Sequence, residues 1–422
     1  MERLVDLGQV CATIHHGCMG LPQELVDHVM YMLCDNIPAL KACSLTCKAM
    51  FASTRHLIHQ TLQLSLGKAL RILTEEENRL YDYERGDPDV EFRLISFMDE
   101  RGLLQYARRV HIFMQDLFTP ETLLPHLHCF RLLNQVHTLT INFFYPNNWV
   151  NYHSTSFAHF YPTLTSLTLR NPCNHDWLLN FALRFPNLEN LSLEAPRIHH
   201  ELDVIDTAAP EVTPPLRGCL RLVGLYGTSG PFRETPKGFN FRSVELYDSF
   251  SGNQARHALN ACARTLEILT IRAYSLRKLR LPAIADRFSD PSIVHAELGY
   301  LKLTEMAVLR RLTLRGRMEF YNVFLNLDNP LLVILSTIVS PVFCELVLEL
   351  SGSSPLPKRQ SMEGWGPWRD LDNLVEDKFA RNRDFRFIIR TSEFSDQEEL
   401  RRRAEWGFPL LAGRGCIYVE TL

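Results

Sequence analysis

The chain has no excess of charge of either sign. Its 45 lysines and arginines face 48 aspartates and glutamates, so the 422 residues carry a formal net charge of −3. Proteins that bind nucleic acid without sequence specificity neutralise phosphates with a basic surface, and a near-neutral chain has no such general attraction. We therefore expect no nucleic-acid partner. Hydrophobic residues make up 46% of the chain, which is too many for a disordered one.

Long hydrophobic runs are also missing. The longest, residues 331–343, is interrupted by serines, a threonine and Pro341, and it is shorter than the roughly 20 residues that a membrane-spanning helix needs. Residues 1–20 have neither the basic start nor the continuous apolar core of a signal peptide. The 11 cysteines are odd in number and scattered along the chain, as is typical of reduced thiols. We therefore expect no membrane segment and a location in the cytoplasm, the nucleus or both.

Motifs of catalysis are absent as well. The sequence has no Gly-x-Ser-x-Gly turn for a nucleophilic serine, no His-Glu-x-x-His zinc helix and no glycine-rich loop for a phosphate or a dinucleotide. The densest group of potential metal ligands matches no common zinc-finger spacing; it consists of Cys11, His15, His16 and Cys18. We therefore expect a non-enzymatic protein with no catalytic residues, no metal and no cofactor.

Residues 21–64 have the pattern of three short helices. The first is expected to begin near Pro22 and end near Asp35, with one apolar stripe at intervals of four residues: Leu21, Leu25, Val29 and Leu33. Asn36 is a suitable cap for the second helix, with Pro38 in its first turn, and a third helix follows Thr46. Three helices of this length bury too little to be robustly stable alone. Their apolar faces are therefore expected to dock on a partner or on the following domain.

The rest of the chain repeats one phrase, apolar-x-x-apolar-x-apolar. Its eight copies lie at 136–141, 164–169, 188–193, 220–225, 241–246, 266–271, 309–314 and 343–348. Three positions match by chance at roughly one start in ten, so the evidence lies in the flanks, where helix-compatible stretches such as 177–185 and 254–262 lead through a turn into the phrase. Four of the seven intervals between copies lie within the 20–29 residues of leucine-rich repeats, and the other three are longer. The pattern predicts an α/β solenoid of parallel strands with returning helices, curved as a horseshoe or an arc.

Two polar, turn-rich insertions interrupt the repeats, near 195–217 and 351–370. Such loops often carry recognition. Within the second, Trp365 and Trp368 are candidate target-binding residues, because a partly exposed indole is a good binding anchor. Packing back onto the solenoid is the alternative that we favour for them. A last helix at 408–411 and a strand at 416–419 are expected to close the array.

Residues 21–64 closely resemble the F-box, the three-helix motif that docks on the Skp adaptor of cullin-RING ubiquitin ligases. The resemblance rests on Leu21-Pro22-Gln23-Glu24-Leu25-Val26, on the apolar stripe of the first helix, and on Cys43-Ser44-Leu45-Thr46-Cys47-Lys48 followed by Phe51. Many family members carry a tryptophan near the position of Phe51. With its degenerate repeats, the whole chain is similar to the F-box proteins that filamentous fungi, particularly mushroom-forming ones, encode in large numbers.

The resemblance implies a substrate receptor of a Skp-cullin-F-box ligase, with the repeats recruiting a protein target. The residues implied to bind the adaptor are Leu21, Pro22, Leu25, Val26, Leu33, Leu40 and Leu45. Leu40 and Leu45 could instead fill the small helical core, where Phe51 is expected. The alternative function is a leucine-rich interaction scaffold without a ligase connection, whose F-box-like helices only cap the solenoid. The expected organisation is a leader at 1–20, the F-box at 21–64, a helical connector at 65–130 and the repeat domain at 131–422.

Overall fold

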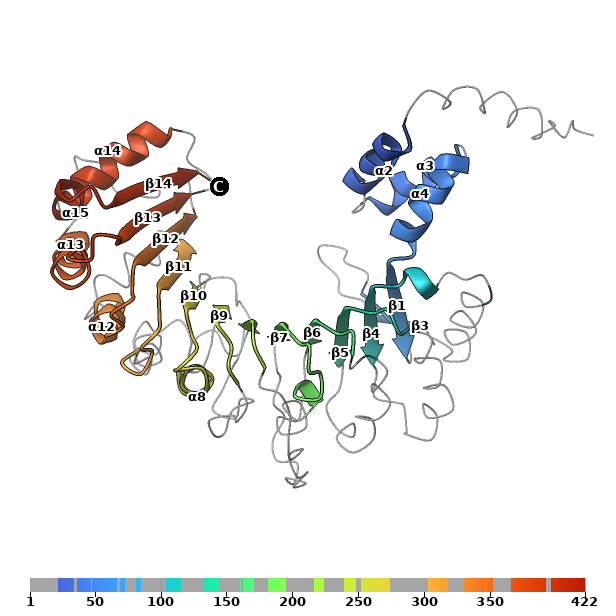
Figure 1. Ribbon diagram of the computed structural model, residues 1–422, viewed down its shortest axis with the longest axis horizontal. Coiled ribbons are helices and arrows are strands. Elements are labelled where there is room, and N and C mark those ends of the chain that lie inside the picture. Colours follow the sequence, from blue (N-terminus) through green and yellow to red (C-terminus); the bar gives the residue numbers. More distant parts are fainter. Residues whose placement is uncertain are drawn as a thin grey trace, which may run out of the picture. The chain divides into compact units, whose positions relative to one another are not determined.

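The computed structural model of the chain forms two compact units, Met1–Thr165 and Ser166–Leu422. Figure 1 shows the helices and strands of both. The residues that the structure describes are 22–33, 36–46, 48–66, 69–72, 81–84, 100, 104–114, 133–143, 160, 162–170, 181–194, 216–223, 239–247, 252–273, 303–317, 330–351, 366–391 and 396–421.

Unit 1 begins with the three helices that the sequence predicts. They are α2 (Gln23–Met32), α3 (Ile37–Ser44) and α4 (Lys48–Ile58). The Oδ1 atom of Asn36 accepts a hydrogen bond of 3.0 Å from the backbone N–H of Ala39, which caps α3, and Pro38 lies in the first turn. The local signals at the start of α3 are therefore confirmed.

These helices enclose a small core of four buried side chains, Val26, Met30, Leu40 and Leu57. Partly buried residues pack around it, namely Leu33, Cys43, Met50 and Ile58. The core side of α2 therefore presents Val26, Met30 and Leu33, which recur at the spacing of four and three residues that one helix face requires.

The strands of unit 1 follow directly after α4. Parallel neighbours are β1 (Thr61–Leu66), β4 (Arg109–Met114) and β5 (Thr138–Phe143). An antiparallel pair, β2 (Ala69–Ile72) with β3 (Tyr81–Glu84), and the short 3-10 helix η1 (Leu104–Tyr106) lie between β1 and β4 in the sequence. A helical connector is expected at 65–130, but most of the described residues in this range form strands.

Unit 2 is an α/β array in which parallel strands follow one another in chain order. Its strands are β6 (Ser166–Arg170), β7 (Asn190–Glu194), β8 (Cys219–Val223), β9 (Ser243–Tyr247), β10 (Ile268–Ala273), β11 (Arg311–Arg317), β12 (Glu345–Ser351), β13 (Arg386–Thr391) and β14 (Ile417–Thr421). Its helices are α8 (Gly252–Ala261), α12 (Pro330–Thr337), α13 (Gly366–Lys378), α14 (Gln397–Gly407) and α15 (Pro409–Gly413). These helices lie on one side of the row of strands, as Figure 1 shows. Parallel strands with returning helices are thus confirmed for this unit.

The repeated phrase marks the residues that point from each strand into the core. In the copy at 164–169, for example, Leu164, Leu167 and Leu169 are all fully buried. The strand begins two residues after the phrase does, so its second and fourth residues are the apolar ones. Alternation along a strand sends their neighbours to the opposite, open face of the sheet. The same offset holds for all copies except the one at 220–225.

That exception comes from one additional residue before β8. Leu216, Leu220 and Leu222 are the buried residues here, so the first spacing is four residues rather than three. Gly218 lies in the extra turn with a φ of 93°, and a Cβ atom on it would lie 2.0 Å from the backbone oxygen of Glu189. Only glycine fits both the backbone angle and the close approach.

Backbone hydrogen bonds join each repeat to the next at the entrance of its strand. The carbonyl oxygen of Arg242 accepts from the N–H groups of Glu267 (2.8 Å) and Ile268 (3.0 Å). The same double acceptance recurs at five further carbonyls, those of Gln60, Arg108, Gly218, Glu267 and Arg310. Neighbouring repeats are thus held in register by main-chain groups whatever the side chains on the open face.

The last helix and strand, predicted at 408–411 and 416–419, are present as α15 and β14. Below them, Trp368 of α13 packs edge-to-face on Phe408, which in turn contacts Phe387 of β13. The buried carboxylate of Asp372 accepts hydrogen bonds from the backbone N–H groups of Leu410 (2.9 Å) and Leu411 (3.1 Å) at the start of α15. Burial raises the pKa of Asp372, an effect that these two hydrogen bonds oppose.

Candidate interaction surfaces

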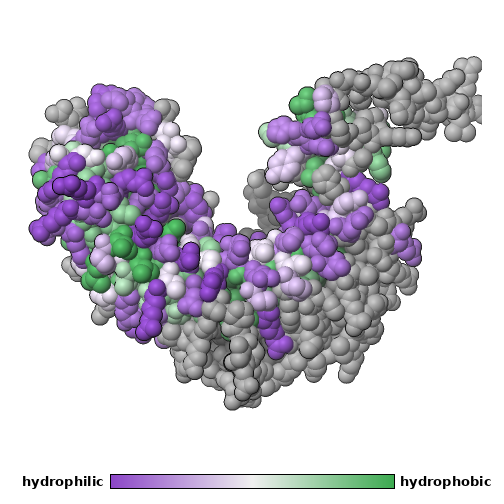
Figure 2. Space-filling model, viewed as in Figure 1, coloured by the Kyte–Doolittle hydropathy of each residue, from purple (hydrophilic) through white to green (hydrophobic). Residues whose placement is uncertain are grey.

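The first candidate surface is the outer face of α2. Leu25 and Val29 are each 52% exposed, and Met32 is 73% exposed. Their spacing of four and three residues places them on one face, and the exposed Pro22 lies at the N-cap of the helix. Figure 2 shows hydrophobic side chains on the surface of these helices. An apolar stripe that the unit leaves uncovered is the kind of surface that a protein partner buries.

Not all residues implied to bind the adaptor lie on this face. Val26 and Leu40 are buried in the core of the three helices, and Leu33 is partly buried against it. These three support the surface from beneath, because an adaptor cannot reach Val26 or Leu40 while the helices are folded. Pro22 and Leu25 are accessible, and Leu21 lies outside the described residues.

Two further apolar side chains of these helices are exposed. Leu45, just after α3, is 86% exposed, and Phe51 of α4 is 51% exposed. The expectation that Phe51 fills the helical core is therefore wrong. In its place Met50 and Thr54 face inward, and the Thr54 hydroxyl donates to the carbonyl oxygen of Met50 at 2.8 Å. The sequence of α4 alone does not show which of its two faces is buried, because both faces carry large side chains.

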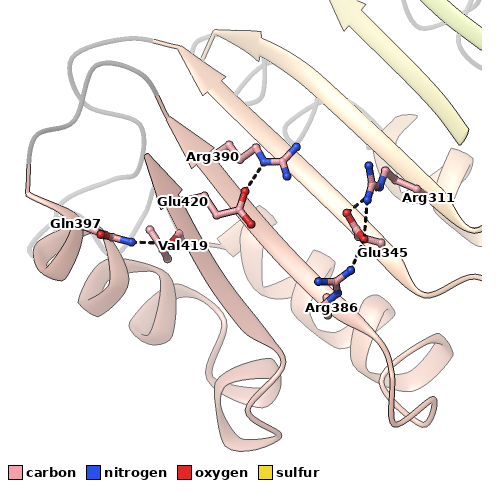
Figure 3. A network of polar contacts seen from close by, with 7 residues as sticks. All are labelled: Arg311, Glu345, Arg386, Arg390, Gln397, Val419 and Glu420. Carbon is pink, nitrogen blue, oxygen red and sulfur yellow. Dashed lines mark hydrogen bonds and ion pairs between the residues drawn. The ribbon is translucent and has the colours of Figure 1, made fainter. Parts of the chain in front are cut away.

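The second candidate surface is the open face of the strands of unit 2, which carries rows of ion pairs. Glu345 of β12 lies between Arg311 of β11 and Arg386 of β13, as Figure 3 shows. Its Oε1 is 2.7 Å from Arg311 Nε, and its Oε2 is 2.8 Å from Arg386 Nη2. The carboxylate is almost completely buried, whereas the two arginines remain partly exposed.

A second row runs parallel to the first, four residues further along β11, β12 and β13, and extends to β14. Arg315 Nε contacts Glu349 at 2.8 Å, and Arg390 Nε contacts Glu420 at 2.6 Å. Burial raises the pKa of Glu349, and the nearby positive charges of Arg272 and Arg390 oppose the shift. Registered rows of alternating charge on adjacent strands stabilise the sheet and also give this face a defined charge pattern.

The strand β14 ends the row of described strands and is partly covered. The side chain of Gln397 in α14 donates a hydrogen bond of 2.9 Å to the carbonyl oxygen of Val419, which Figure 3 also shows. An uncovered strand edge is a template for pairing with other chains, and a side chain on one of its acceptors reduces that tendency.

The two tryptophans proposed for target binding have different outcomes. Trp368 is completely buried beneath α15, so its indole fits the alternative in which the residue packs onto the solenoid, and it offers no exposed anchor. Trp365 lies outside the described residues.

The described part of the chain lacks both a cluster of metal-binding side chains and a helix suited to span a membrane. It contains no cluster of three or more His, Cys, Asp or Glu side chains placed to hold a metal ion. It also contains no helix that combines the length and the apolar character needed to cross a membrane. The densest predicted ligand group, in residues 11–18, lies outside the described residues.

Comparison with known proteins adds no relative. No protein-family model matches this chain, and no curated protein sequence matches it significantly. The surfaces described above and the resemblance carried by residues 21–64 are therefore the remaining indications of function.

Proposed function

We propose that the protein is a substrate receptor of a Skp-cullin-F-box ubiquitin ligase. In this proposal α2, α3 and α4 are the F-box and dock on a Skp-type adaptor, which links them to the cullin. The leucine-rich array then recruits a protein target, and neither part performs catalysis. The observation that carries the proposal is the exposed apolar stripe of α2, because the helices have already closed their own core without it.

Burial of this stripe can supply a large part of the free energy that docking requires. Complete burial of one large aliphatic side chain contributes about 1.5–3 kcal/mol. Leu25, Val29 and Met32 are between half and three quarters exposed, so docking would bury most of each side chain anew. Together with Leu45 and Phe51, the gross gain reaches about 5–10 kcal/mol, which is comparable with the cost of association. Additional contacts then decide the net affinity.

A second candidate function has its own supporting observation. Helix α4 ends at Ile58 and β1 begins at Thr61, and the guanidinium of Arg55 lies 5.8 Å from the centre of the Tyr106 ring beside β4. The three helices are therefore joined closely to the first strands of unit 1. This arrangement suits helices that cap an interaction scaffold with no ligase connection.

The two functions make opposite predictions for the outer face of α2. Leu25→Asp together with Met32→Asp places two charges on the exposed stripe without touching Val26 or Met30. If the proposal is correct, the wild-type protein captures a purified Skp-type adaptor in a pull-down and this double variant does not. A scaffold with capping helices would fail to capture the adaptor in either form.

A matched control separates loss of docking from loss of folding. Val333→Asp and Val339→Asp place the same charges on exposed apolar residues of unit 2, and they should leave adaptor capture unchanged. Circular dichroism of both double variants should match that of the wild-type protein. Capture that survives Leu25→Asp and Met32→Asp would refute the assigned docking face.

A further inference from the structure

The open face of unit 2 holds an unusual aromatic and cationic arrangement at β8, β9 and β10. The ring of Tyr247 on β9 has a guanidinium from each neighbouring strand close to it. The Cζ atom of Arg221 on β8 is 4.3 Å from the ring centre, and that of Arg272 on β10 is 4.4 Å from it. Cation–π attraction therefore holds both side chains in defined positions.

Neither arginine forms an ion pair. Among the residues that the structure describes, no Asp or Glu oxygen lies within ion-pair distance of Arg221 or Arg272, although five other arginines of unit 2's strands and Arg242, just before β9, have such partners; the five are Arg170, Arg311, Arg315, Arg386 and Arg390. The Nε atom of Arg272 is buried without a hydrogen-bond partner. Two carboxylates act on this cluster electrostatically without pairing with either arginine.

Those carboxylates are Glu245 and Glu349. Glu245 lies directly opposite Arg221 in the register of β8 and β9; burial and this carboxylate raise the pKa of the Tyr247 phenol, and the charges of Arg272 and Arg221 oppose the shift. Glu349 is paired with Arg315. Arg315 is also the direct neighbour of Arg272 in the register of β10 and β11, and two like charges placed opposite each other are destabilising. An added anion would relieve this unfavourable placement.

The charge of the whole face points in the same direction. From β8 to β14, the outward strand positions with described side chains hold six arginines and four glutamates: Arg221, Arg272, Arg311, Arg315, Arg386, Arg390, Glu245, Glu345, Glu349 and Glu420. This face is therefore positive in a chain whose net charge is −3. Its two excess positive charges divide between the row of Arg311, Glu345 and Arg386 and the cluster of Arg221, Glu245 and Arg272.

We propose that Arg221, Tyr247 and Arg272 form a recognition site for an extended acidic peptide segment that carries two carboxylates in an acidic-x-acidic pattern. The assignment of that segment to a recruited protein rests on the function proposed above. Each stacked guanidinium offers a planar fork of donors that suits a carboxylate. Tyr247 fixes the separation of the two forks.

The spacing favours two carboxylates over a single phosphate. The two Cζ atoms are at most about twice 4.4 Å apart, and they belong to the strands on either side of β9. In an extended peptide, side chains two residues apart project from the same face and are separated by about 7 Å. Two acidic side chains can therefore meet both forks, whereas one phosphate would have to draw both arginines off the ring.

Direct binding of defined probes to the purified full chain tests the site. The probe is a fluorescein-labelled peptide of 12 residues, with Glu-Ser-Glu at the centre of a Gly/Ser background, measured by fluorescence anisotropy. We expect it to bind at least about tenfold more tightly than the same peptide with Gln-Ser-Gln, and its affinity to fall as salt is added. Arg221→Gln combined with Arg272→Gln should weaken binding at least about tenfold.

Two control variants distinguish a built site from general positive charge. The helix control, Arg381→Gln with Arg401→Gln, removes the same charge from an exposed arginine just after α13 and another on α14, and it should leave binding unchanged. Arg221→Lys with Arg272→Lys keeps the charge but loses the planar forks, and it should bind as weakly as the glutamine variant. All variants should retain the circular dichroism spectrum and the unfolding midpoint of the wild-type protein within error.

Several results would overturn the site. These are equal binding of the Glu and Gln peptides, wild-type affinity in the lysine variant, an equal loss in the helix control, and tighter binding of a phosphoserine peptide or of a 12-nucleotide single-stranded RNA. Adaptor capture, measured on the same preparations, is a separate result. Its absence would refute the ligase function and leave the peptide site standing, and the converse also holds.

Discussion

The ion-pair row around Glu345 provides a quantitative test of how the open face contributes to stability. The change is Glu345→Gln, which keeps the shape of the side chain and removes its charge. In the wild-type protein the carboxylate joins three strands, because it contacts Arg311 of β11 and Arg386 of β13 from its place on β12. The variant retains one carbonyl oxygen as an acceptor and loses the second.

The expected loss of stability depends on how deeply each partner of the ion pairs is buried. Removing one partner of a fully buried ion pair costs about 3–5 kcal/mol, because the other charge is left without compensation. Here only the glutamate is buried; the side chains of Arg311 and Arg386 are 38% and 51% exposed and can recover hydration. The variant also avoids the desolvation of the carboxylate. We therefore expect a loss of about 1–2 kcal/mol in the free energy of unfolding of this region.

Amide hydrogen exchange is the appropriate assay, because the two units of the chain need not unfold together. The variant should lower protection in β11, β12 and β13 together and leave β6 and β7 unchanged. Glu405→Gln, which removes an exposed pair with Arg401 on α14, is the matched control and should change none of these strands. A loss below about 0.3 kcal/mol in Glu345→Gln would refute the reasoning, since the row would then behave as an ordinary surface pair.

Three further predictions concern single residues of unit 2. Gly218→Ala should destabilise the unit by more than about 2 kcal/mol in urea unfolding, because its Cβ would lie 2.0 Å from a backbone oxygen at a φ of 93°; a neutral result would contradict the tight turn. Burial raises the pKa of Asp372 above 3.8, so the carboxyl group binds its proton more firmly in the folded state than in the unfolded state. The resulting contribution to stability is complete below pH 3.8 and is lost as the pH rises through the raised pKa. Asp372→Asn should therefore flatten the fall in stability with rising pH above 3.8, measured by unfolding at a series of pH values, and an unchanged slope would refute it. Burial raises the pKa of Cys262 to about 12, so iodoacetamide at pH 8 should label the partly exposed Cys344 well before Cys262, as mass spectrometry of peptides can resolve.

Much of the array could be predicted from the sequence because the repeated phrase reflects a physical requirement. Each strand must bury two alternate side chains, and the turn before it must bury a third, so three apolar positions recur at fixed spacing. The copies at 241–246 and 309–314 illustrate this, since all their apolar positions are buried. The order of the strands in the sheet follows from the rule that two strands joined through a helix lie parallel and next to each other.

Two of the strands that the phrase missed, β1 and β13, fail it at one position. In the repeats of β1 and β13 the first apolar position is occupied by His59 and Asp384, although Phe387 and Ile389 are buried in β13 as the rest of the phrase requires. A further copy of the phrase lies at 107–112 and leads into β4. It begins with an alanine, and it lies within the range where the sequence predicts a helical connector. A pattern of three residues cannot recover a repeat in which a polar side chain replaces one of them.

The copy at 220–225 failed for a different reason. The extra residue at Gly218 moves the buried positions of β8 one residue further from the preceding turn. A phrase with fixed spacing then assigns the wrong residues to the core. Insertion of one residue is visible in a sequence only when the neighbouring repeats are already aligned.

The two faces of α2 show why the candidate adaptor site was only partly predicted. Leu25, Val29 and Met32 form one apolar face, and Val26, Met30 and Leu33 form another that begins one residue later. Hydrophobicity alone does not say which face the chain buries within itself. The choice depends on α3 and α4, whose side chains Leu40 and Leu57 complete the core.

A helix with two apolar faces has a consequence for the stability of the isolated module. The core of α2, α3 and α4 contains only four fully buried apolar side chains, and full burial of each contributes about 1.5–3 kcal/mol. That gain is small against the conformational entropy of ordering three helices, about 1–2 kcal/mol per residue for the backbone. The second face adds nothing until a partner covers it. Stability of these helices and occupation of the outer face of α2 are therefore coupled, so an adaptor that buries Leu25 and Val29 should also slow amide exchange at Val26 and Met30, which it never touches.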